Sequence, residues 1–340
     1  MNTILVTGGA GFIGSHTCVA LLEAGFNVII ADNFSNSSIA SIQGIEAITG
    51  KTLTLYEIDI ANPERLRAIF SDHKINAVIH FAGLKAVGES CQQPLLYYAK
   101  NLQSTLTLLQ EMSKAGVFNL IFSSSATVYA SSNSIPYKEH YRLGGNSPYA
   151  ETKIMIEKML SDIFQSDPIW KITLLRYFNP AGAHPSALIG ENPLDTPNNL
   201  MPFITQVAAG KRELVQVFGN DYATLDGTGV RDYIHVMDVA EGHLHALNEV
   251  LTHNKSFIET YNLGSGRGYS VLEIIKMFEN ITHKPIKYKF VERRRGDISE
   301  FYADVSKIEK RLGWRPKYGL DNICQDAWNW QIHNLRNTKK

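Results

Sequence analysis

Residues 3–14 read TILVTGGAGFIG, and this stretch decides the fold of the chain. The apolar run Thr3–Thr7 predicts a buried strand, and residues 14–24 predict the helix that follows it. Between them the pattern G-x-x-G-x-x-G places its glycines at Gly8, Gly11 and Gly14. Such glycines allow a tight turn and let the backbone approach a pyrophosphate at the helix N-terminus. We therefore predict a dinucleotide site here.

Further strands and helices alternate along the first half of the chain. Apolar, β-branched runs predict strands at 27–31, 53–59, 77–81, 120–123 and 172–176. Two long amphipathic patterns predict helices at 94–114 and 148–164. Strands of this kind separated by helices predict an α/β fold, with a Rossmann-type, doubly wound parallel sheet.

The composition changes after about Phe178. Residues 179–203 contain five prolines and are expected to form an ordered loop. Beyond it we expect helices at 204–210 and at the C-terminus, strands at 215–218, 261–263 and 286–290, and a strand or turn plus helix over 232–249. This organisation predicts a dinucleotide-binding domain over 1–178 and a smaller C-terminal α/β domain over 179–340. Part of 231–263 is expected to return to the first domain.

The charge balance and the cysteines bound the class of protein. Lysine plus arginine equals aspartate plus glutamate at 33 each, which does not favour a nucleic-acid partner. No apolar run reaches the 18 or more residues of a membrane span, and no signal peptide is expected. Cys18, Cys91 and Cys324 have no metal spacing, so we expect reduced core thiols. A cytoplasmic enzyme with no membrane partner is the expectation.

Asp32 ends the second predicted strand, 18 residues after Gly14. A carboxylate there accepts hydrogen bonds from an adenosine ribose and repels a 2′-phosphate. No arginine follows it, since the next residues are Asn33 and Phe34. NAD is therefore predicted in preference to NADP. Asp59, which closes the third strand, is a weaker candidate for the adenine edge.

Tyr149 and Lys153 are four residues apart on a predicted helix, so both side chains project from one face. A lysine ammonium there stabilises a phenolate and lowers the pKa of the tyrosine. A tyrosine tuned in this way is a general base for a sugar hydroxyl. Ser125 ends the serine run 123–125 and completes the candidate triad, while Ser123 and Ser124 are predicted to make strand-end hydrogen bonds.

Two further clusters have simpler interpretations. His243 and His245 could suggest a metal, but no further ligand stands at a suitable spacing, so no metal site is predicted. The run Arg293–Arg295 is interpreted as one phosphate ligand and two exposed charges, because the chain as a whole is neutral.

With these parts in place, the chain resembles the extended short-chain dehydrogenase/reductase family. Within it the resemblance is strongest to the epimerases that act on UDP-glucose and UDP-galactose, and it covers the chain essentially end to end. The residues that carry it are long blocks at 6–17, 80–90, 122–129, 175–180, 197–202, 218–222 and 226–235. The glycine loop and the Tyr149/Lys153 pair mark only the superfamily.

The resemblance implies a reaction and its partners. Tyr149 would take the proton of the sugar 4-hydroxyl as the hydride passes to bound NAD. The 4-keto sugar would then turn over in the site, and the hydride would return to the opposite face. The net result is an isomerase of galactose metabolism that interconverts UDP-glucose and UDP-galactose, with UDP as the anchor.

The resemblance also implies roles for individual residues. Ser125 would hydrogen-bond the reacting hydroxyl, and Lys153 would hold the nicotinamide ribose while tuning Tyr149. The implied cofactor site comprises Gly8, Gly11, Phe12, Ile13, Gly14, Asp32, Asn33, Asp59, Ile60, Phe81, Ala82, Gly83, Lys85, Asn101, Tyr149, Lys153 and Tyr177. The implied substrate site comprises Ser125, Asn179, Asn199, Leu200, Phe218, Arg231, Tyr233, Arg294, Asp297 and Phe301. Two arginines facing a diphosphate are a natural bidentate clamp.

Some positions depart from the family pattern. Ala130 and Ala150 stand where glycine is common, and both changes are small. Arg295 replaces a usual glutamate, which changes local charge pairing but leaves Arg294 in register. Phe301 falls where the family carries either a bulky aromatic or a small residue at the wall of the sugar pocket, and the resemblance implies that the bulky side chain excludes an N-acetyl group. We therefore expect preference for UDP-glucose and UDP-galactose over their N-acetylated analogues.

Rival functions and the association state are also considered. A nucleotide-sugar 4,6-dehydratase needs an additional acid and base, but Ala126 and Thr127 follow Ser125. A decarboxylase of the same family is a further rival. A non-catalytic dinucleotide sensor would be free to lose Tyr149 or Lys153.

The two long helices predict a homodimer through a four-helix bundle, with plain burial in the monomer as the alternative. Their extra apolar residues are Leu95, Leu96, Leu106, Leu109, Ile154, Ile156, Met159 and Ile163.

Overall fold

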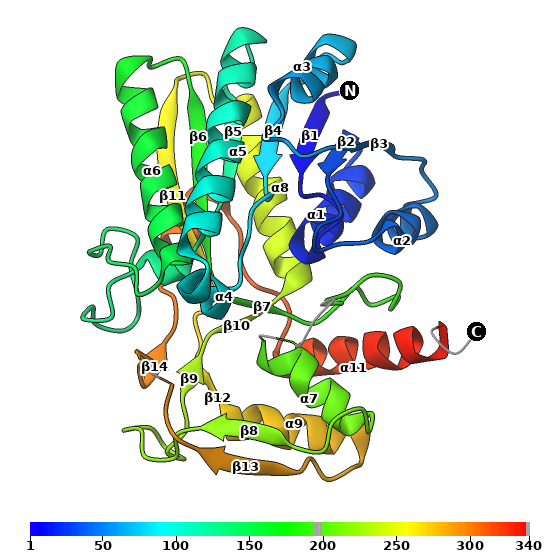
Figure 1. The fold of residues 1–340 in the computed structure, drawn as a ribbon, viewed down its shortest axis with the longest axis vertical. Coiled ribbons are helices and arrows are strands. Elements are labelled where there is room, and N and C mark those ends of the chain that lie inside the picture. Colours follow the sequence, from blue (N-terminus) through cyan, green and yellow to red (C-terminus); the bar gives the residue numbers. More distant parts are fainter. Residues whose placement is uncertain (193–196, 198, 295, 338–340) are drawn as a thin grey trace.

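The computed structural model describes residues 1–192, 197, 199–294 and 296–337. Its centre is a seven-stranded parallel sheet with strand order β11-β6-β5-β4-β1-β2-β3 (Figure 1). The strands are β1 (Thr3–Thr7), β2 (Asn27–Asp32), β3 (Thr54–Glu57), β4 (Ala77–His80), β5 (Asn119–Ser125), β6 (Lys171–Tyr177) and β11 (Phe257–Leu263). The chain moves outward from β1 to β3 and then restarts at β4 on the other side of β1. In open α/β sheets ligands bind beyond the strand ends at such a reversal point.

Helices cover both faces of this sheet. One face carries α3 (Pro63–Asp72), α5 (Pro94–Lys114) and α6 (Pro148–Ser166). The other face carries α1 (Phe12–Glu23), α2 (Ile39–Thr49), α8 (Val236–Thr252) and α10 (Ser306–Leu312). Because both faces are covered, the central strands β1, β2 and β4 are continuous apolar runs over most of their length instead of alternating with polar residues, whereas the edge strand β3 is partly exposed. The predicted doubly wound α/β fold is confirmed.

Alternate residues of each strand serve the two cores. In β5, Leu120 and Phe122 pack into the cluster with α3, α5 and α6, whereas Ile121 packs into the cluster with α1 and α8. Each such side chain is fully or almost fully buried, and burial of one contributes roughly 1.5–3 kcal/mol. This alternation also decides the direction of the polar side chains at the strand end, from Ser123 to Ser125.

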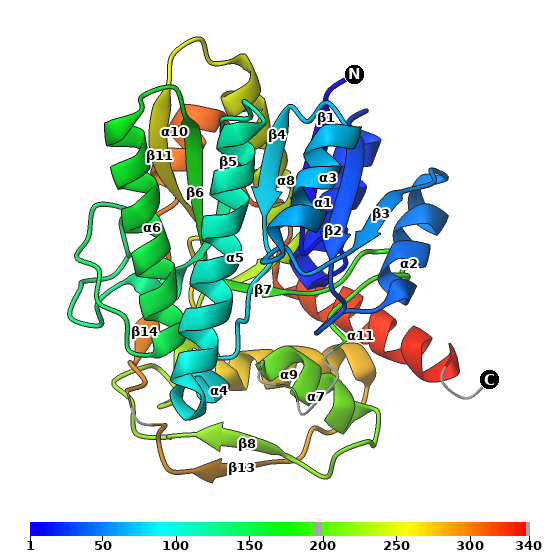
Figure 2. The ribbon, with the colours of Figure 1, turned by 45° about the horizontal axis from the view of Figure 1, so that its top comes forward.

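A smaller set of elements lies beyond the C-terminal ends of β1 and β4, below the sheet in Figures 1 and 2. Its strands form small sheets in which β7 pairs β10, β8 pairs β13, and β9 pairs both β12 and β14. The strands are β7 (Asn179–Ala181), β8 (Val215–Phe218), β9 (Val230–Arg231), β10 (Tyr233–His235), β12 (Tyr269–Ser270), β13 (Tyr288–Val291) and β14 (Glu300–Phe301). The helices are α7 (Leu200–Ala208), α9 (Val271–Thr282) and α11 (Leu320–Asn337), while α4 (Val87–Gln92) and the 3-10 helix η1 (Ala126–Val128) follow β4 and β5.

Several predicted boundaries are wrong. The helix predicted at 204–210 is α7, which begins at Leu200, because Pro202 lies in the first turn where its missing N–H costs nothing. The segment 179–203 is not all loop, since β7 pairs in parallel with β10. The strand predicted at 286–290 is β13 at Tyr288–Val291, and the one predicted at 261–263 is the longer β11.

Helices α3 and α9 were not predicted from hydrophobic pattern, although capping signals precede both. The Asn62 side chain accepts hydrogen bonds from the N–H groups of Glu64 and Arg65, with Pro63 at the first helical position. Ser270 and Glu273 form a capping box at the start of α9. Both patterns are typical of a helix N-terminus.

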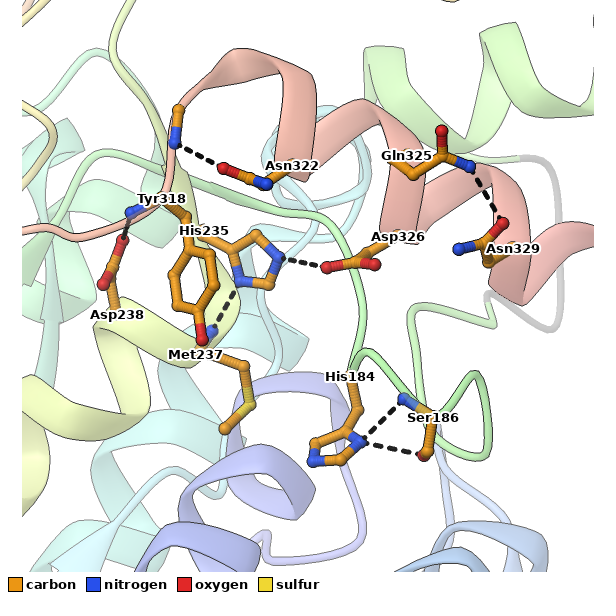
Figure 3. A network of polar contacts seen from close by, with 11 residues as sticks. His184, Ser186, His235, Met237, Asp238, Tyr318, Asn322, Gln325, Asp326 and Asn329 are labelled. Atoms are coloured by element: carbon orange, nitrogen blue, oxygen red, sulfur yellow. Dashed lines mark hydrogen bonds and ion pairs between the residues drawn. The ribbon is translucent and has the colours of Figure 1, made fainter. Parts of the chain in front are cut away.

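The C-terminal helix is tied to the helix behind the sheet through His235 (Figure 3). The N–H of Met237 donates to His235 Nδ1 at 3.1 Å, so Nε2 carries the proton and donates to Asp326 of α11 at 3.1 Å. The ring of Tyr318 packs on the imidazole with centroids 4.4 Å apart. Asp238 accepts a hydrogen bond from the N–H of Tyr318 at 3.1 Å. These contacts fix α11 against the start of α8.

Two further predictions concern the cysteines and membrane-spanning helices. Cys18 and Cys324 are buried free thiols, but Cys91 is exposed on the short helix α4, so its prediction as a core thiol is wrong. Within the described ranges, no helix has the length and apolar character to cross a membrane. The domain boundary at 178/179 stays a prediction, although β11 lies in the sheet beside β6.

Candidate active site

The glycine loop turns sharply between β1 and α1. Gly8 has φ +72° and its N–H donates to the carbonyl of Ala31 at 2.8 Å. A Cβ atom on Gly8 would lie 2.7 Å from the backbone nitrogen of Ala82, and one on Gly14 would lie 2.3 Å from the carbonyl oxygen of Gly8. No side chain caps α1 at Gly11, so the first-turn N–H groups point out of the helix toward the loop. The loop therefore has the form that binds a phosphate.

Asp32 lies beside this loop at the end of β2 and is mostly buried. Its carboxylate accepts hydrogen bonds from Ala10 N–H at 3.0 Å, Phe34 N–H at 2.9 Å and the Ser37 hydroxyl at 2.8 Å. The side chain of the neighbouring Asn33 accepts a hydrogen bond from the N–H of Ser35. Asp32 is thus held rigidly against the glycine loop.

Asp59 and Ile60 follow β3, next to β2. Ile60 is buried, and Asp59 accepts hydrogen bonds from Ala61 N–H at 2.9 Å and from the Lys100 ammonium at 3.0 Å. Partial burial acts to raise the pKa of Asp59, but these two donors hold it below the ordinary value. The carboxylate is ionised and lies on the same sheet edge as Asp32.

The loop after β4 runs directly over the glycine loop. The N–H groups of Phe81 and Ala82 both donate to the carbonyl of Thr7, at 2.9 and 3.1 Å. Gly83 has φ +156°, and a Cβ there would lie 3.2 Å from the side-chain oxygen of Asn101. Lys85, further along, is half-exposed and pairs with Glu191 at 3.7 Å.

A chain of hydrogen bonds passes from the end of β1 to α5. Thr105 donates to the carbonyl of Asn101 at 2.8 Å, so it accepts the proton of His80 Nε2 at 3.0 Å. His80 Nδ1 is then an acceptor, and the Thr7 hydroxyl donates to it at 2.7 Å. His80 is fully buried, and burial lowers its pKa to about 3, which keeps the ring neutral.

Asn101 continues this chain to the helix that carries Tyr149. Its side chain accepts from Leu84 N–H at 2.8 Å and donates to the carbonyl of Leu84 at 3.0 Å. The same amide donates to the Thr152 hydroxyl at 3.1 Å, and Thr152 donates to the carbonyl of Tyr149 at 2.7 Å. The glycine loop and the Tyr149 turn of α6 are therefore linked through His80 and Asn101.

Ser125, Tyr149 and Lys153 converge at the ends of β5 and α6. Burial raises the pKa of Tyr149, and a hydrogen bond with the Ser125 hydroxyl acts to lower it. The Lys153 ammonium lies 5.9 Å from the centre of the Tyr149 ring and donates to the carbonyl of Ser123 at 2.7 Å. Burial lowers the pKa of Lys153 to about 8. The predicted lowering of the Tyr149 pKa by Lys153 stays a prediction.

A buried ion pair supports the helix behind these residues. Glu157, one turn beyond Lys153, forms a bidentate pair with Arg176 of β6, with contacts of 2.9 and 2.5 Å. The Ser124 hydroxyl also donates to Glu157 at 2.5 Å. The Arg176 guanidinium packs 4.8 Å from the centre of the Tyr129 ring. The predicted role of Ser124 as a strand-end hydrogen-bonding residue is confirmed.

The candidate substrate residues enter from the C-terminal elements. Asn179 and Tyr233 pair across β7 and β10, and the N–H of Asn179 donates to the carbonyl of Asp232 at 2.9 Å. Burial raises the pKa of Tyr233 to about 12. Asn199, which precedes Leu200 at the start of α7, donates to Glu191 at 2.7 Å. Since Glu191 also pairs with Lys85, it connects the candidate cofactor and substrate residues.

Two of the arginines line the same region in different ways. Arg231 donates to Asp297 at 3.2 Å, and Arg294 packs 4.0 Å from the centre of the Phe218 ring. Arg293 turns aside to Asp221, at 2.7 Å. Arg295 lies outside the described residues. The assignment of Arg231 and Arg294 as diphosphate ligands stays a prediction.

Phe301 lies against two other aromatic rings. Its ring centre is 4.5 Å from that of Tyr137 and 4.9 Å from that of Phe178. All three belong to one apolar cluster with Ala126 and Val128, which directly follow Ser125. This cluster brings the predicted pocket wall close to the candidate catalytic strand end.

The fold and the site together define a dinucleotide-binding enzyme of the short-chain dehydrogenase/reductase type. A family model described as GDP-mannose 4,6 dehydratase matches residues 5–327. The chain belongs to the UDP-glucose 4-epimerases, since the UDP-glucose 4-epimerase of Bacillus subtilis (strain 168) is 53% identical over 336 residues, 99% of this chain and 98% of that protein.

Other relatives and solved structures are similar to this chain over nearly their whole length. The UDP-glucose 4-epimerase of Haemophilus influenzae is 54% identical, with 97% of this chain and 98% of that protein covered. The solved UDP-glucose 4-epimerase of Bifidobacterium longum, in complex with NAD+ and UDP, is 48% identical with a TM-score of 0.94 and covers 98% of this chain and 99% of its own. The Stenotrophomonas maltophila enzyme, with bound NAD and formylated UDP-arabinopyranose, is 46% identical with a TM-score of 0.97, and 99% of this chain and 100% of that chain are covered.

His80, Glu157 and His243 were not predicted from the sequence as parts of the site. His80 lies in the block 80–90 that carries the family resemblance, which was a usable signal. Glu157 lies four residues after Lys153, on the same face of α6, and this spacing could have indicated it. His243 comes from α8 on the opposite face of the sheet, and its Nε2 lies 2.6 Å from the hydroxyl of Tyr177. Nothing in the local sequence of His243 indicates this contact.

Proposed function

We propose that this enzyme interconverts UDP-glucose and UDP-galactose by reversible oxidation at the sugar C4 with bound NAD. One observation carries the proposal. Ser125, Tyr149 and Lys153 meet at the strand ends next to a phosphate-binding loop, in a chain that matches UDP-glucose 4-epimerases from end to end. The coarser conclusion, an epimerase of UDP-sugars, rests on the relatives, and the residue roles below are our proposals.

The residues present fit NAD. Gly8 and Gly14 leave the space that a Cβ would occupy, and α1 presents uncapped N–H groups to a pyrophosphate. Asp32 provides acceptors for ribose hydroxyls and repels a 2′-phosphate. Bound NAD would supply the hydride acceptor for C4 and the charged ring that favours a nearby phenolate. The residues proposed to hold it are Gly8, Gly11, Phe12, Ile13, Gly14, Asp32, Asn33, Asp59, Ile60, Phe81, Ala82, Gly83, Lys85, Asn101, Tyr149, Lys153 and Tyr177.

Tyr149 is the proposed general base. Its phenolate takes the proton of the 4-hydroxyl, while the Ser125 hydroxyl holds that oxygen in place. Burial raises the pKa of Tyr149, so ionisation near neutral pH requires the Ser125 hydrogen bond and the positive charge of Lys153 one turn away. The proton returns from Tyr149 to the same oxygen when the product forms.

The UDP portion is the proposed anchor. Arg231 and Arg294 neutralise the diphosphate, Phe218 lies beside the uracil, and Asn179, Asn199, Leu200, Tyr233 and Asp297 complete this part of the site. Because the sugar must present both faces of C4, its own contacts have to be weaker than those of the nucleotide. Phe301 is the proposed wall that excludes an N-acetyl group.

The description of the matching family model raises dehydration as a second reaction. Elimination of water requires an acid and a base beside the active serine. The residues that follow Ser125 are Ala126, which is buried, and Thr127, which donates to Ser125 at 2.9 Å. Neither side chain titrates near neutral pH, and this favours epimerisation.

We further propose a cytoplasmic homodimer. Leu95, Leu106 and Met155 on α5 and α6 are 83%, 39% and 41% exposed, which supports a partner surface on these helices. Leu109 and Ile156 are buried in the core and are not available to a partner. Light scattering at micromolar concentration, with a Leu95→Glu variant, tests the dimer; a monomeric parent chain would reject it. The three free thiols are consistent with a reducing compartment.

The decisive experiment is incubation of the purified enzyme with UDP-galactose and no added cofactor, with products resolved by NMR. We expect UDP-glucose at a stable ratio, with NAD carried through purification. Tyr149→Phe should lower kcat by roughly 10³-fold, within the range for loss of a general base. No conversion by the parent enzyme, even with added NAD, would reject the proposal. A 4-keto-6-deoxy product would indicate dehydration, and an unaffected Tyr149→Phe variant would remove Tyr149 from the reaction.

A further inference from the structure

The histidine pair on α8 is divided between two environments. His243 is fully buried behind the ends of β4 and β6, whereas His245 is partly buried and its Nδ1 donates to the carbonyl of Leu312 at 2.9 Å. Among the residues that the structure describes, no group of three or more possible ligands surrounds a metal position. Of the two, His243 contacts a candidate site residue, Tyr177.

Hydrogen-bond directions around His243 follow from its neighbours. Its Nδ1 lies 2.8 Å from the carbonyl of Val239, one helical turn earlier, so Nδ1 carries the proton. Nε2 consequently has a lone pair and lies 2.6 Å from the hydroxyl of Tyr177, which must donate to it. Burial lowers the pKa of His243 to about 4, so this neutral tautomer persists across the physiological range.

Tyr177 is thereby left with acceptor capacity only. Its single proton points to His243, and its oxygen accepts from the Ser123 hydroxyl, whose own carbonyl accepts from Lys153 at 2.7 Å. Tyr149 lies close enough to influence Tyr177 electrostatically. The ring of Phe81 packs on the other side of His243, with centroids 4.8 Å apart. His243 thus connects the ends of β4, β5 and β6 from behind the sheet.

We propose that His243 is a positioning residue for the epimerase reaction, which holds the Tyr177 proton and so presents the phenol oxygen to the cofactor pocket purely as a hydrogen-bond acceptor. Such an acceptor matches an N–H donor, and the carboxamide of a nicotinamide ring provides one. The inference rests on the proposed function, because it assumes that Tyr177 lines the NAD pocket. It assigns a role to a residue of α8, outside the elements β5 and α6 that carry the candidate triad.

The test compares three variants of the purified holoenzyme. His243→Phe keeps a ring against Phe81 and removes the acceptor Nε2 together with the Nδ1–H donor to the Val239 carbonyl, whereas His243→Gln places an amide oxygen near the position of Nε2. His245→Phe on the same helix is the matched control. Measured for each are kcat, KM for UDP-galactose, NAD content per chain, and the fluorescence of the bound cofactor after borohydride reduction.

We expect His243→Phe to lower kcat about tenfold, the size of one lost hydrogen bond, with KM for UDP-galactose changed less than about twofold. NAD content should fall and the fluorescence of the reduced cofactor should shift. His243→Gln should recover most of the activity, and His245→Phe should match the parent in all four measurements.

A double variant separates positioning from a merely structural role. If His243 acts through Tyr177, then Tyr177→Phe combined with His243→Phe should resemble Tyr177→Phe alone. Fully additive losses would overturn the proposal, as would a His243→Phe enzyme with parental kcat and NAD content. A parent enzyme that binds NAD but does not convert UDP-galactose would instead reject the proposed function, and the NAD measurements would still test the His243 contact.

Discussion

The two halves of the candidate site are built differently. At the ends of the sheet strands the polar groups are buried: the side chains of Glu157 and Arg176 are 6% and 5% exposed, and each joins several hydrogen bonds. In the C-terminal half the side chains of Arg231 and Asp297 are 20% and 34% exposed and share one contact of 3.2 Å. The first arrangement fixes the groups behind the candidate triad, and the second leaves charged groups partly exposed to solvent.

This difference has an energetic basis. A buried charge requires its partner, because an unpaired one costs several kcal/mol in a low-dielectric interior. A partly exposed pair is worth about 1 kcal/mol or less, so it can be exchanged for a phosphate at little cost. We therefore expect substitutions in the buried network to affect folding and chemistry, and substitutions in the clamp to affect substrate binding.

The largest effect is expected from breaking the buried pair. Glu157→Ala leaves Arg176 charged and unpaired and removes the acceptor of Ser124, so the free energy of unfolding should fall by about 3–5 kcal/mol. Urea unfolding of the holoenzyme measures this. Glu259→Ala is the control, because its partners Lys307 and Arg311 lie at the surface, and it should cost under about 1 kcal/mol. Equal losses of unfolding free energy in Glu157→Ala and Glu259→Ala would contradict the expected difference between a buried and an exposed ion pair.

A smaller effect is expected from pH. Burial lowers the pKa of His16 and His80 to about 3 and that of His243 to about 4, against an ordinary value of 6.5. As pH falls, the unfolded chain takes up these protons before the folded chain does. The contribution of the three neutral histidines to the free energy of unfolding is therefore complete above pH 6.5 and is lost as pH falls toward 3. Between pH 8 and 6 each histidine should cost about 0.8 kcal/mol, roughly 2.5 kcal/mol together.

Unfolding measured at both pH values checks this figure. Burial raises the pKa of Asp232 and Asp238, which act in the opposite direction, whereas burial lowers the pKa of His184 and Lys153, which act in the same direction. The figure is therefore the contribution of the three fully buried histidines alone. His16 Nε2 is buried and has no hydrogen-bond partner among the described residues, and Nδ1 bonds the Phe12 carbonyl of its own helix at 2.6 Å. His16→Leu should therefore cost about one hydrogen bond, roughly 1 kcal/mol, at pH 8 and remove about a third of the pH-dependent loss. An unchanged pH dependence in that variant would contradict the assignment to buried histidines.

The sequence could predict the local elements of the sheet, but it could not predict the contacts between distant residues that support the site. Strands such as β1 and β2 were predictable because continuous apolar runs between turn signals suit a sheet covered on both faces. Tyr149 and Lys153 were predictable because one helical turn separates them. The partners of this pair were not, since His80 meets Thr7 across 73 residues and Tyr177 meets His243 across 66. Such pairings depend on the tertiary fold and have no local periodicity.

The C-terminal half of the site was less accessible still to pattern analysis. Arg231 and Phe301 lie on strands of two residues, and Arg294 lies in a connection between strands. Elements this short have no hydrophobic period that a sequence could reveal, so their roles came only from the family resemblance. Their assignment remains a proposal that substitution must test.

Substitution of Arg231 tests the clamp directly. Arg231→Ala should raise KM for UDP-galactose about 30-fold, with kcat changed less than about threefold, since one charged contact to phosphate contributes roughly 2 kcal/mol of binding. Arg293→Ala is the matched control, because Arg293 pairs with Asp221 and packs on Tyr222. A KM effect in the control as large as that in Arg231→Ala would show that general charge, not the clamp, holds the nucleotide.

The smallest effect is expected at the pocket wall, where the two halves meet. Phe301 packs on Phe178 and Tyr137, so Phe301→Ala opens space at the proposed sugar site without removing a hydrogen bond. We expect kcat/KM for UDP-N-acetylgalactosamine to rise about tenfold relative to UDP-galactose, the scale of a few apolar contacts in a pocket. Phe290→Ala, at an exposed position on β13, should leave this ratio unchanged. If the parent enzyme already turned over both substrates equally, Phe301 would not exclude the N-acetyl group. Phe301 would then not mark the place where the buried strand ends meet the partly exposed C-terminal half of the site.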